Sequence, residues 1–381
     1  MKVAIVAGEK SGDYLAADLI KAIRQRYPKA EFKGLCGPLM QQQGAVSLAD
    51  MDKISIFGLD GLLSSLREIL AIRKMLFRSF LEWQPDVFIG VDVPDFNLRL
   101  ERKLKDHDIP CVHYVSPTVW AWRGGRIKKI RRSIDLMLTL FPFEKKYYQQ
   151  NNTPVEYVGH PLAKQIMEWQ VDLTLFQTLG LNSLDRDSFK LVAVLPGSRM
   201  SEVSKLAPIM FDGINRLLQK NINLKFVIPA ANQKINDYLK QLPNYRPNQV
   251  EIINGQSRDL MALCDFVILA SGTAALEAAL FAKPMVVMYK VSKLSELVFK
   301  NTISVEHYSM PNHLTKTPVV PELIQDAATV DNLVIEVEKL LMDTDYFQNM
   351  QKSLAQIAPN LNTNSGELAC QAIEELLQKR N

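Results

Sequence analysis

Short apolar segments alternate with polar or small-residue loops and with helical stretches along most of the chain. Such segments begin at Val3, Val87 and Cys111 in the first half and at Leu191 and Phe266 in the second. Strands of a parallel sheet read as continuous Val, Ile and Leu runs, because helices cover both faces of the sheet. The pattern therefore predicts an α/β protein with a doubly wound parallel sheet in each half.

The same pattern predicts the individual elements. Strands are expected at residues 3–7, 32–36, 87–91, 111–115, 136–140 and 155–158, and then at 190–195, 225–229, 250–253, 266–269 and 284–288. Apolar residues at helical spacing predict a long helix over 62–83. The pattern weakens after His160, and 381 residues are more than one core usually holds. We therefore expect a first domain over 1–160, a second over 161–365, and a terminal helix over 366–381 that packs back on the first.

Composition narrows the classes of function. The chain is 47% apolar and 23% charged with a net charge of +4, which is ordinary for a globular protein and too small to indicate nucleic acid by itself. Its four cysteines form no CxxC pair and its five histidines form no HExxH motif, which favours reduced thiols and argues against a zinc site. The sequence shows no signal peptide and no membrane-spanning run, so a cytoplasmic protein is expected.

The loops after the predicted strands carry the candidate chemistry, because ligands of such sheets bind at the carboxyl ends of the strands. Two loops in the second half, 196–199 and 271–277, combine small residues with a helix start, where backbone N–H groups and the helix dipole favour a phosphate. Arg199 adds a positive charge, and the Glu277 carboxylate suits a ribose diol. Each loop alone is explained by the tight turn that its glycine permits. Two such loops in one domain favour a diphosphate.

In the first half, Asp92 follows a buried strand directly and is the candidate general base for a hydroxyl group. Asp95, after Pro94, suits the ordinary role of a helix N-cap. His113 is the rival base, but its position inside the next strand favours a core histidine. His160, between the predicted domains, is expected to be a hinge or to line a ligand. Candidate loops follow three predicted strands in the first half and two in the second. This distribution indicates a ligand held in a cleft between the domains.

The stretch from Arg123 to Arg132 carries six basic residues and no acidic one, and Trp120 and Trp122 precede it. This composition is found on solvated helix faces, at nucleic-acid interfaces, and at anionic membrane surfaces where tryptophan lies at headgroup level. The residues alone leave these alternatives open.

Six motifs follow one another along the chain: VAGEKSGD, PDVFIGVDVPDFN, HYVSPTVWAWR, LPGSR, ASGTAALE and YSMPN. Together they resemble the lipid-A-disaccharide synthases, and the resemblance runs from about Lys2 into the terminal helix. It implies the GT-B fold, in which two Rossmann-like domains face a cleft. It also implies an inverting, metal-independent glycosyltransferase of lipopolysaccharide biosynthesis. Such an enzyme joins UDP-2,3-diacylglucosamine to 2,3-diacylglucosamine 1-phosphate and gives a β(1→6) disaccharide and UDP.

Site residues follow from the resemblance, position by position. Asp92 in GVDVPD matches the family's proposed base. The PGSR, SGTAALE, MPN and PELIQ motifs match the donor site through Gly197, Ser198, Arg199, Ser271, Gly272, Thr273, Glu277, Asn312, Glu322 and Gln325. Arg199 is also expected to act in catalysis by stabilising the leaving diphosphate. The residues expected on the acceptor side of the cleft are Glu9, Ser11, His113 and Ser116.

The implied substrates are two-tailed lipids, so the cleft must reach a bilayer surface. Phe57, Leu59, Leu62 and Leu63, at and before the start of the predicted 62–83 helix, are expected to contact acyl chains, and core packing is the alternative for that apolar stripe. We expect a peripheral protein on the inner face of the cytoplasmic membrane, with no nucleic-acid partner, no cofactor and no metal. A homodimer is left open. So are another UDP-sugar enzyme, such as a 2-epimerase, and a non-catalytic nucleotide-sugar scaffold.

Overall fold

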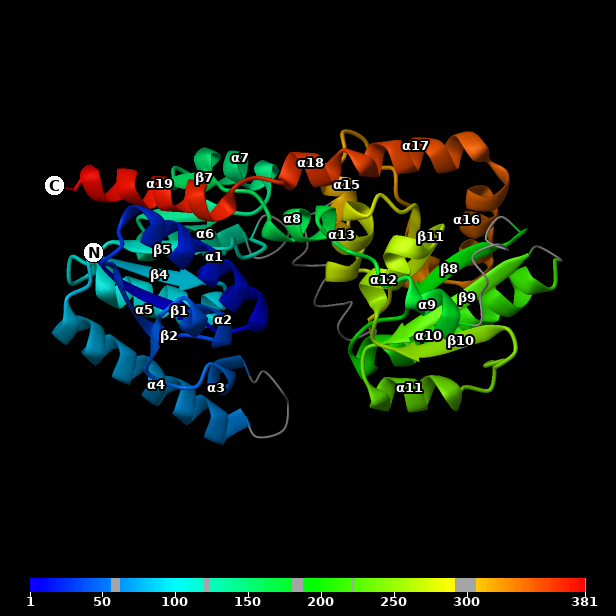
Figure 1. Cartoon of the computed structure of the whole chain (residues 1–381), viewed down its shortest axis with the longest axis horizontal. Helices are drawn as coiled ribbons and strands as arrows, with labels where there is room; N and C mark the ends of the chain where they lie inside the picture. Colours follow the sequence, from blue (N-terminus) through cyan, green and yellow to red (C-terminus); the bar gives the residue numbers. More distant parts are fainter. Residues whose placement is uncertain (56–61, 120–123, 180–187, 221–222, 292–305, 381) are drawn as a thin grey trace. The chain divides into compact units, whose positions relative to one another are not determined.

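Two compact units make up the structure, a computed structural model that describes residues 1–55, 62–119, 124–179, 188–220, 223–291 and 306–380 (Figure 1). The first unit comprises Met1–Pro161 together with Leu361–Asn381, and the second comprises Leu162–Asn360. Each unit has its own parallel sheet with helices packed on it. The predicted fold class, with two doubly wound α/β sheets, is confirmed.

The sheet of the first unit has seven parallel strands in the order β3-β2-β1-β4-β5-β6-β7. Their bounds are β1 Lys2–Ala7, β2 Glu31–Leu35, β3 Val46–Ser47, β4 Val87–Val91, β5 Cys111–Tyr114, β6 Leu136–Thr139 and β7 Val155–Tyr157. Along β1, Val3, Ile5 and Ala7 join one apolar cluster, whereas Ala4 and Val6 join another on the opposite face. Both faces are therefore buried, which is why these strands read as unbroken apolar runs.

Helices cover both faces of this sheet. Their bounds are α1 Lys10–Arg26, α2 Pro38–Gln42, α3 Asp52–Ser55, α4 Leu62–Trp83, α5 Pro94–Lys105, the 3-10 turn η1 Gly124–Arg126, α6 Ile127–Ser133, α7 Pro142–Gln150 and α19 Ser365–Gln378. Cys370 and Ile373 of the C-terminal α19 join the same apolar cluster as α1. Arg26 of α1 forms ion pairs with Glu367 and Glu374 of α19. The chain end thus completes the core of the first unit.

The sheet of the second unit has six parallel strands in the order β10-β9-β8-β11-β12-β13. The strand bounds are β8 Lys190–Leu195, β9 Leu224–Ala230, β10 Val250–Asn254, β11 Phe266–Ala270, β12 Met285–Tyr289 and β13 Glu322–Ile324. The helix bounds are α8 Pro161–Met167, α9 Thr174–Thr178, α10 Met200–Leu218, α11 Gln233–Lys240, α12 Ser257–Leu263, α13 Thr273–Leu280, α15 Met310–Leu314, the 3-10 turn η3 Gln325–Ala327, α16 Val330–Met342, α17 Thr344–Ala355 and α18 Ile357–Leu361.

Most of the expected strands, and the long helix, lie within one or two residues of their predicted bounds. Two strands, β3 and β13, are missing from the prediction. The first is Val46–Ser47, and the second begins with the polar Glu322, so neither gives a recognisable apolar run. Both lie at the edge of their sheets, where short strands are common.

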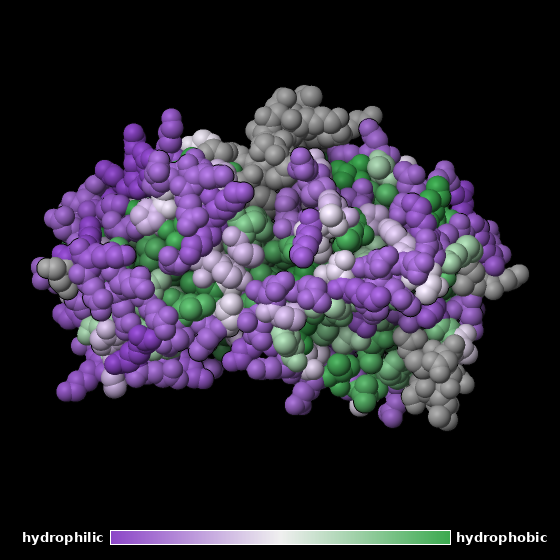
Figure 2. Space-filling model, turned by 90° about the horizontal axis from the view of Figure 1, so that it is seen from above, coloured by the Kyte–Doolittle hydropathy of each residue, from purple (hydrophilic) through white to green (hydrophobic). Residues whose placement is uncertain are grey.

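The surface in Figure 2 is mainly hydrophilic, with hydrophobic residues in smaller areas between the polar ones. Among the helices that the structure describes, none is both long enough and apolar enough to cross a membrane. All four cysteines are buried free thiols. Burial raises the pKa of Cys36 and of Cys264 to about 12, so these thiols stay protonated and unreactive near neutral pH.

Candidate functional site

The order of the strands reverses once in each sheet, and this fixes where a ligand can bind. In the first unit the reversal lies between β1 and β4, where Ala7 pairs with Val91. In the second unit it lies between β8 and β11, where Leu195 pairs with Leu269. In an open α/β sheet, a crevice forms outside the carboxyl ends of the strands at such a reversal. The candidate loops that follow these four strands therefore lie at the two reversals.

Asp92 lies directly after β4 in an unusual backbone conformation. Its φ is 54° and that of Val93 is 42°, so two consecutive non-glycine residues are left-handed. A β-branched residue is an outlier there, and such conformations cost about 1–3 kcal/mol each. The half-buried Asp92 carboxylate accepts a hydrogen bond from the Val93 N–H at 2.8 Å. Strained turns of this kind concentrate at functional sites. The turn therefore supports the prediction that Asp92 has a role in the reaction.

Two neighbours hold this turn in place. Asn97 of α5 is fully buried, and its side-chain amide donates to the Asp92 carbonyl at 2.8 Å. From the other side, a Cβ at Gly8 would lie 2.6 Å from Val93 Cγ2, so only glycine lets the loop after β1 approach the loop after β4 this closely. The exposed Glu9 follows as the N-cap residue of α1. Glu9 and Asp92 thus lie on the same edge of the sheet, at neighbouring strand ends.

His113 and Glu101 form a buried pair within the first unit. His113 Nδ1 lies 2.6 Å from Glu101 Oε1, and neither side chain is exposed. Burial raises the pKa of Glu101, and the neighbouring histidine opposes this shift. Among the described residues, His113 Nε2 and Glu101 Oε2 have no hydrogen-bond partner. A histidine enclosed in this way has no open path to a substrate hydroxyl, which favours the core interpretation over that of a base.

Ser11, Ser116 and His160 occupy different surroundings. Ser11 is exposed in the first turn of α1. The Ser116 hydroxyl is buried and lies 2.9 Å from both the Tyr148 hydroxyl and the Pro117 carbonyl oxygen. Burial lowers the pKa of His160 to about 4, which keeps its ring neutral near pH 7. The exposed Ser11 therefore fits the acceptor side better than the enclosed Ser116 does.

In the second unit, the loop after β8 leads into α10. Gly197 has a φ of 127°, which favours glycine, and a Cβ there would lie 2.8 Å from the Glu202 Cβ. Ser198 is exposed, and Arg199 is the N-cap residue with a side chain that is 77% exposed. Arg199 pairs with Glu202 at 3.0 Å, an interaction that solvent screens and that contributes little to stability. A diphosphate can therefore replace Glu202 as the partner of Arg199.

The loop after β11 is the second predicted phosphate loop. The Ser271 N–H donates to the Met288 carbonyl at 2.8 Å, and its hydroxyl donates to the Tyr308 carbonyl at 3.0 Å. Gly272 and Thr273 are exposed, and a Cβ at Gly272 would meet no atom within 4 Å. No side chain in the described part of the protein caps α13 with a hydrogen bond. Its first N–H groups are thus available to an anionic ligand.

Glu277 lies one turn into α13 and is held by Arg258 of α12. The Nε and Nη2 atoms of Arg258 bind Glu277 Oε1 at 2.9 and 2.7 Å. The Arg258 guanidinium also lies 5.3 Å from the centre of the Trp169 ring, and Trp169 Nε1 donates to Asp259 at 3.0 Å. Within the described residues, Glu277 Oε2 has no hydrogen bond or ion pair. The carboxylate is therefore oriented and keeps one oxygen for a ligand such as a ribose diol.

Asn312 and Glu322 lie in one hydrogen-bond network. The half-buried Glu322 carboxylate accepts bonds from the N–H of Tyr308 at 2.7 Å, from the N–H and hydroxyl of Ser309 at 3.0 and 2.6 Å, and from the Asn312 amide at 2.7 Å. Asn312 itself is buried. Gln325 follows β13 with a left-handed φ of 52°. The network fixes the backbone of Tyr308, which the loop after β11 contacts, so these residues shape the predicted donor site indirectly.

Most residues of the predicted acyl-chain contact lie outside the residues that the structure describes. Phe57, Leu59, Trp120, Trp122 and Arg123 lie outside the described residues, as do the side chains of Leu62 and Leu63 at the start of α4. Further along α4, Leu76 and Phe80 are fully buried, whereas Leu70 is 42% exposed. The later part of the helix is therefore core, and the membrane contact at its start stays a prediction.

Sequence reasoning missed three residues that support the site. Arg258 lies on a different helix from Glu277, and no local signal links the two. Tyr289, at the end of β12, lies against Tyr308 with ring centres 6.5 Å apart. Burial chiefly raises the pKa of Tyr289, with a smaller contribution from Glu202, so the tyrosine lies within electrostatic reach of the loop after β8. Asn97 was visible only as part of the PDFN motif.

No metal centre is formed by the side chains that the structure describes, because no three His, Cys, Asp or Glu residues are grouped to hold an ion. Metal independence remains a prediction about the reaction, to be tested on the protein itself.

Solved structures share the fold. The UDP-N-acetylglucosamine 2-epimerase from Neisseria meningitidis, solved with UDP-GlcNAc, matches with a TM-score of 0.61 at 15% identity and covers 100% of both chains. MurG from Acinetobacter baumannii matches with a TM-score of 0.58 at 14% identity, over 98% of this chain and 99% of its own. At such low identity the likeness shows a GT-B-like fold and nothing more about activity.

Sequence comparisons are more specific. The lipid-A-disaccharide synthase of Alcanivorax borkumensis is 43% identical over 377 residues, which are 99% of this chain and 97% of that protein. Its counterpart in Pseudomonas aeruginosa is 41% identical over 386 residues, covering 100% of this chain and 99% of that protein. The family profile described as lipid-A-disaccharide synthetase matches residues 3–376. The resemblance predicted from the six motifs is confirmed, and the chain belongs to the lipid-A-disaccharide synthase family of glycosyltransferases.

Proposed function

We propose that this chain transfers a diacylglucosaminyl group from UDP-2,3-diacylglucosamine to the 6-hydroxyl of 2,3-diacylglucosamine 1-phosphate. The products are a β(1→6)-linked disaccharide 1-phosphate and UDP. Family membership supports the overall reaction. The single structural observation that supports the mechanism is the placement of Asp92 on a strained turn at the strand reversal of the first unit.

The second unit binds the UDP-sugar in this proposal. The uncapped N-termini of α10 and α13 direct N–H groups at the diphosphate, and Arg199 exchanges Glu202 for a phosphate oxygen. The Oε2 atom of Glu277 accepts hydrogen bonds from the ribose while Arg258 holds Oε1. A hydrogen bond to a charged group contributes about 1.5–3 kcal/mol, so losing Glu277 should weaken nucleotide binding measurably.

The first unit supplies the base. Asp92 accepts the proton of the acceptor's 6-hydroxyl as that oxygen forms a bond to the anomeric carbon of the donor. The bond from that carbon to the UDP oxygen breaks on the opposite face, so the configuration inverts. UDP leaves with the electron pair, and Arg199 together with the helix N-termini stabilises its charge. Glu9 and Ser11, on the same edge as Asp92, are the proposed acceptor contacts.

A UDP-sugar 2-epimerase is the second candidate, because a solved 2-epimerase shares the fold over the whole chain. That likeness is at 15% identity, whereas relatives at 41–43% identity are lipid-A-disaccharide synthases. An epimerase needs no acceptor and would produce a UDP-linked epimer. A scaffold that binds nucleotide sugar without turnover would produce neither product.

Both proposed substrates carry two acyl chains, so we also propose that the protein works as a peripheral protein at an anionic membrane surface. The start of α4 would contact the acyl chains there. A homodimer is compatible with this proposal and is not required by it.

The test is to incubate the purified protein with both substrates in detergent micelles and to measure UDP and the disaccharide by mass spectrometry. We expect one UDP for each disaccharide, and no UDP release when the acceptor is omitted. Formation of an epimer, or UDP release without an acceptor, would count against glycosyl transfer.

A further inference from the structure

A basic groove lies on the first unit, outside the residues assigned to the site. Its volume is about 610 Å³, and seven of its ten lining residues are Lys or Arg. Among the described residues, no acidic side chain lines it. We call it the α4–α5–α6 groove, because its basic residues come from α4 (Arg73), α5 (Arg99, Arg102 and Lys103) and α6 (Lys128, Lys129 and Arg132).

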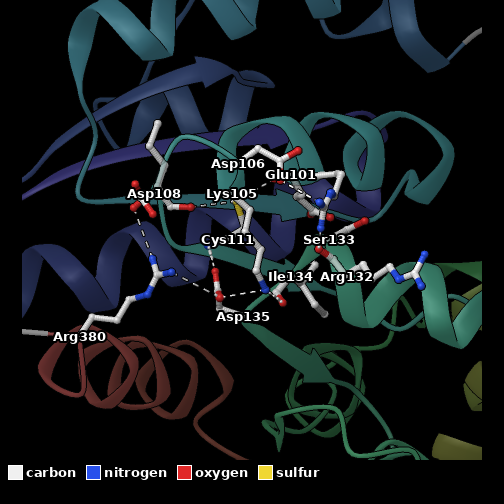
Figure 3. Close-up of polar contacts among 12 residues, drawn as sticks. Glu101, Lys105, Asp106, Asp108, Cys111, Arg132, Ser133, Ile134, Asp135 and Arg380 are labelled. Carbon is white, nitrogen blue, oxygen red and sulfur yellow. Dashed lines mark hydrogen bonds and ion pairs between the residues drawn. The ribbon is translucent and has the colours of Figure 1, made fainter.

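Most of these charges have no acidic partner among the residues that the structure describes. Arg102 pairs with Asp106 at 2.9 Å and also donates to the Arg132 carbonyl at 2.8 Å, which braces α5 against α6. Arg99, Lys128, Lys129 and Arg132 make no ion pair with any carboxylate that the structure describes. Figure 3 shows that the Arg132 guanidinium extends away from the neighbouring polar contacts.

Two cations just outside the groove, Lys105 and Arg380, do have an acidic partner. Asp135 Oδ1 lies 3.0 Å from Lys105 Nζ and 3.7 Å from Arg380 Nη2, so one carboxylate forms ion pairs with both of these residues (Figure 3). Within the groove, by contrast, burial and then the charge of Arg99 lower the pKa of Arg73. Like charges therefore lie close together in the groove, with no described carboxylate among its lining residues. Such an arrangement favours a ligand that carries several negative charges.

Two cations of the groove lie over aromatic rings, and this arrangement argues against nucleic acid. Lys103 lies over the Phe77 ring at 5.6 Å from its centre, and Arg73 lies over the Phe96 ring at 5.9 Å. Cations thus occupy a face of each ring, whereas binding of single-stranded nucleic acid relies on aromatic rings that stack on bases. One phosphate would also use only a few of the seven cations. The groove fits several phosphate groups presented side by side.

We propose that the α4–α5–α6 groove binds the phosphate headgroups of anionic lipids and thereby docks the first unit on the membrane. The proposal rests on the proposed function, which requires access to lipid substrates. The exposed Leu70 lies one turn before Arg73 on α4 and places an apolar side chain near the cations. Clustered cations beside apolar side chains are the usual composition of a surface that binds an anionic bilayer.

The experiment compares two double variants of the full chain. Lys128→Gln with Lys129→Gln removes two groove charges, and Lys21→Gln with Lys29→Gln removes two exposed charges elsewhere on the same unit. Binding is measured by co-sedimentation with phosphatidylcholine vesicles that do or do not contain phosphatidylglycerol. Each membrane-facing lysine contributes about fivefold to binding. The groove variant, which lacks two of them, should therefore bind anionic vesicles about 25-fold more weakly, and the control should change by less than about twofold.

Each alternative gives a different result. Equal losses in both variants would mean that only net charge matters, and unchanged binding in the groove variant would reject the groove outright. Intact vesicle binding with a raised KM for acceptor in detergent micelles would assign the groove to the acceptor's own phosphate. Selective loss of binding to a double-stranded DNA oligonucleotide would assign it to nucleic acid. If the groove variant loses vesicle binding but keeps its turnover in micelles, both this proposal and the proposed function stand.

Discussion

Replacing Asp92 by Asn separates the chemistry from the fold. Asn has nearly the same size, and its side-chain oxygen can still accept the Val93 N–H bond that Asp92 accepts at 2.8 Å. Asn is also among the residues that best tolerate a left-handed φ, here 54°. The carboxylate of Asp92 makes no ion pair with a described residue, so no buried charge is left behind. We therefore expect the free energy of unfolding to change by less than about 0.5 kcal/mol.

The amide cannot accept a proton, so the chemical step should suffer. A general base typically contributes about 10²–10⁴-fold, which is about 3–5 kcal/mol of transition-state stabilisation. We expect kcat to fall by this factor while calorimetry shows unchanged affinity for UDP, because the proposed nucleotide site lies in the other unit. Steady-state UDP release in micelles measures kcat. Near-normal kcat at saturating substrate would refute Asp92 as the base.

His113→Phe is the matched comparison. It leaves Glu101 buried with no partner in place of a contact at 2.6 Å, and breaking a buried pair in this way costs about 3–5 kcal/mol. We therefore expect a large loss of thermal stability with turnover per folded molecule largely retained. The reverse pattern, a stable protein without turnover, would move the role of base from Asp92 to His113.

Three further predictions concern the donor site, metals and the membrane. Arg199→Ala and Glu277→Ala should each weaken UDP binding by about 10-fold or more in calorimetry, and unchanged affinity in both would remove the donor-site assignment. Activity should be unchanged by EDTA, because Arg199 and the helix N-termini are expected to stabilise the charge of the leaving diphosphate without a metal. Loss of activity in EDTA that magnesium or manganese restores would overturn this. Leu62→Ser with Leu63→Ser should reduce vesicle binding and micellar activity with little change in melting temperature. Unfolding with unchanged membrane affinity per folded molecule would assign both leucines to the core.

The sequence predicts the strands that contain a clear apolar run and misses two short edge strands that lack one. β4 and β8 have the expected bounds, because each contains five consecutive apolar or small residues, which mark a buried strand clearly. β3 is too short to show an alternation of apolar and polar residues. β13 begins with Glu322, whose carboxylate accepts a hydrogen bond from the Ser309 hydroxyl. Pairing with a neighbouring strand, and not local pattern, places these edge strands in the sheet.

The site shows the same division. The position of Asp92 after a strand is visible in the sequence, but its left-handed backbone and the Asn97 amide that supports it arise only when α5 packs on the sheet. Glu277 is visible in its motif, whereas Arg258, which orients it, comes from another helix. The candidate ligand contacts follow strand ends and leave a pattern in the chain. Residues that hold them through tertiary contacts leave none.

The linkage in the product tests the central claim most directly. A single displacement, with Asp92 taking the proton and UDP leaving from the opposite face, converts an α-linked donor into a β-linked product. Nuclear magnetic resonance of the purified disaccharide should show only the β(1→6) linkage, with one UDP formed for each molecule. An α linkage, or attachment at a hydroxyl other than the 6-hydroxyl, would contradict the proposed mechanism.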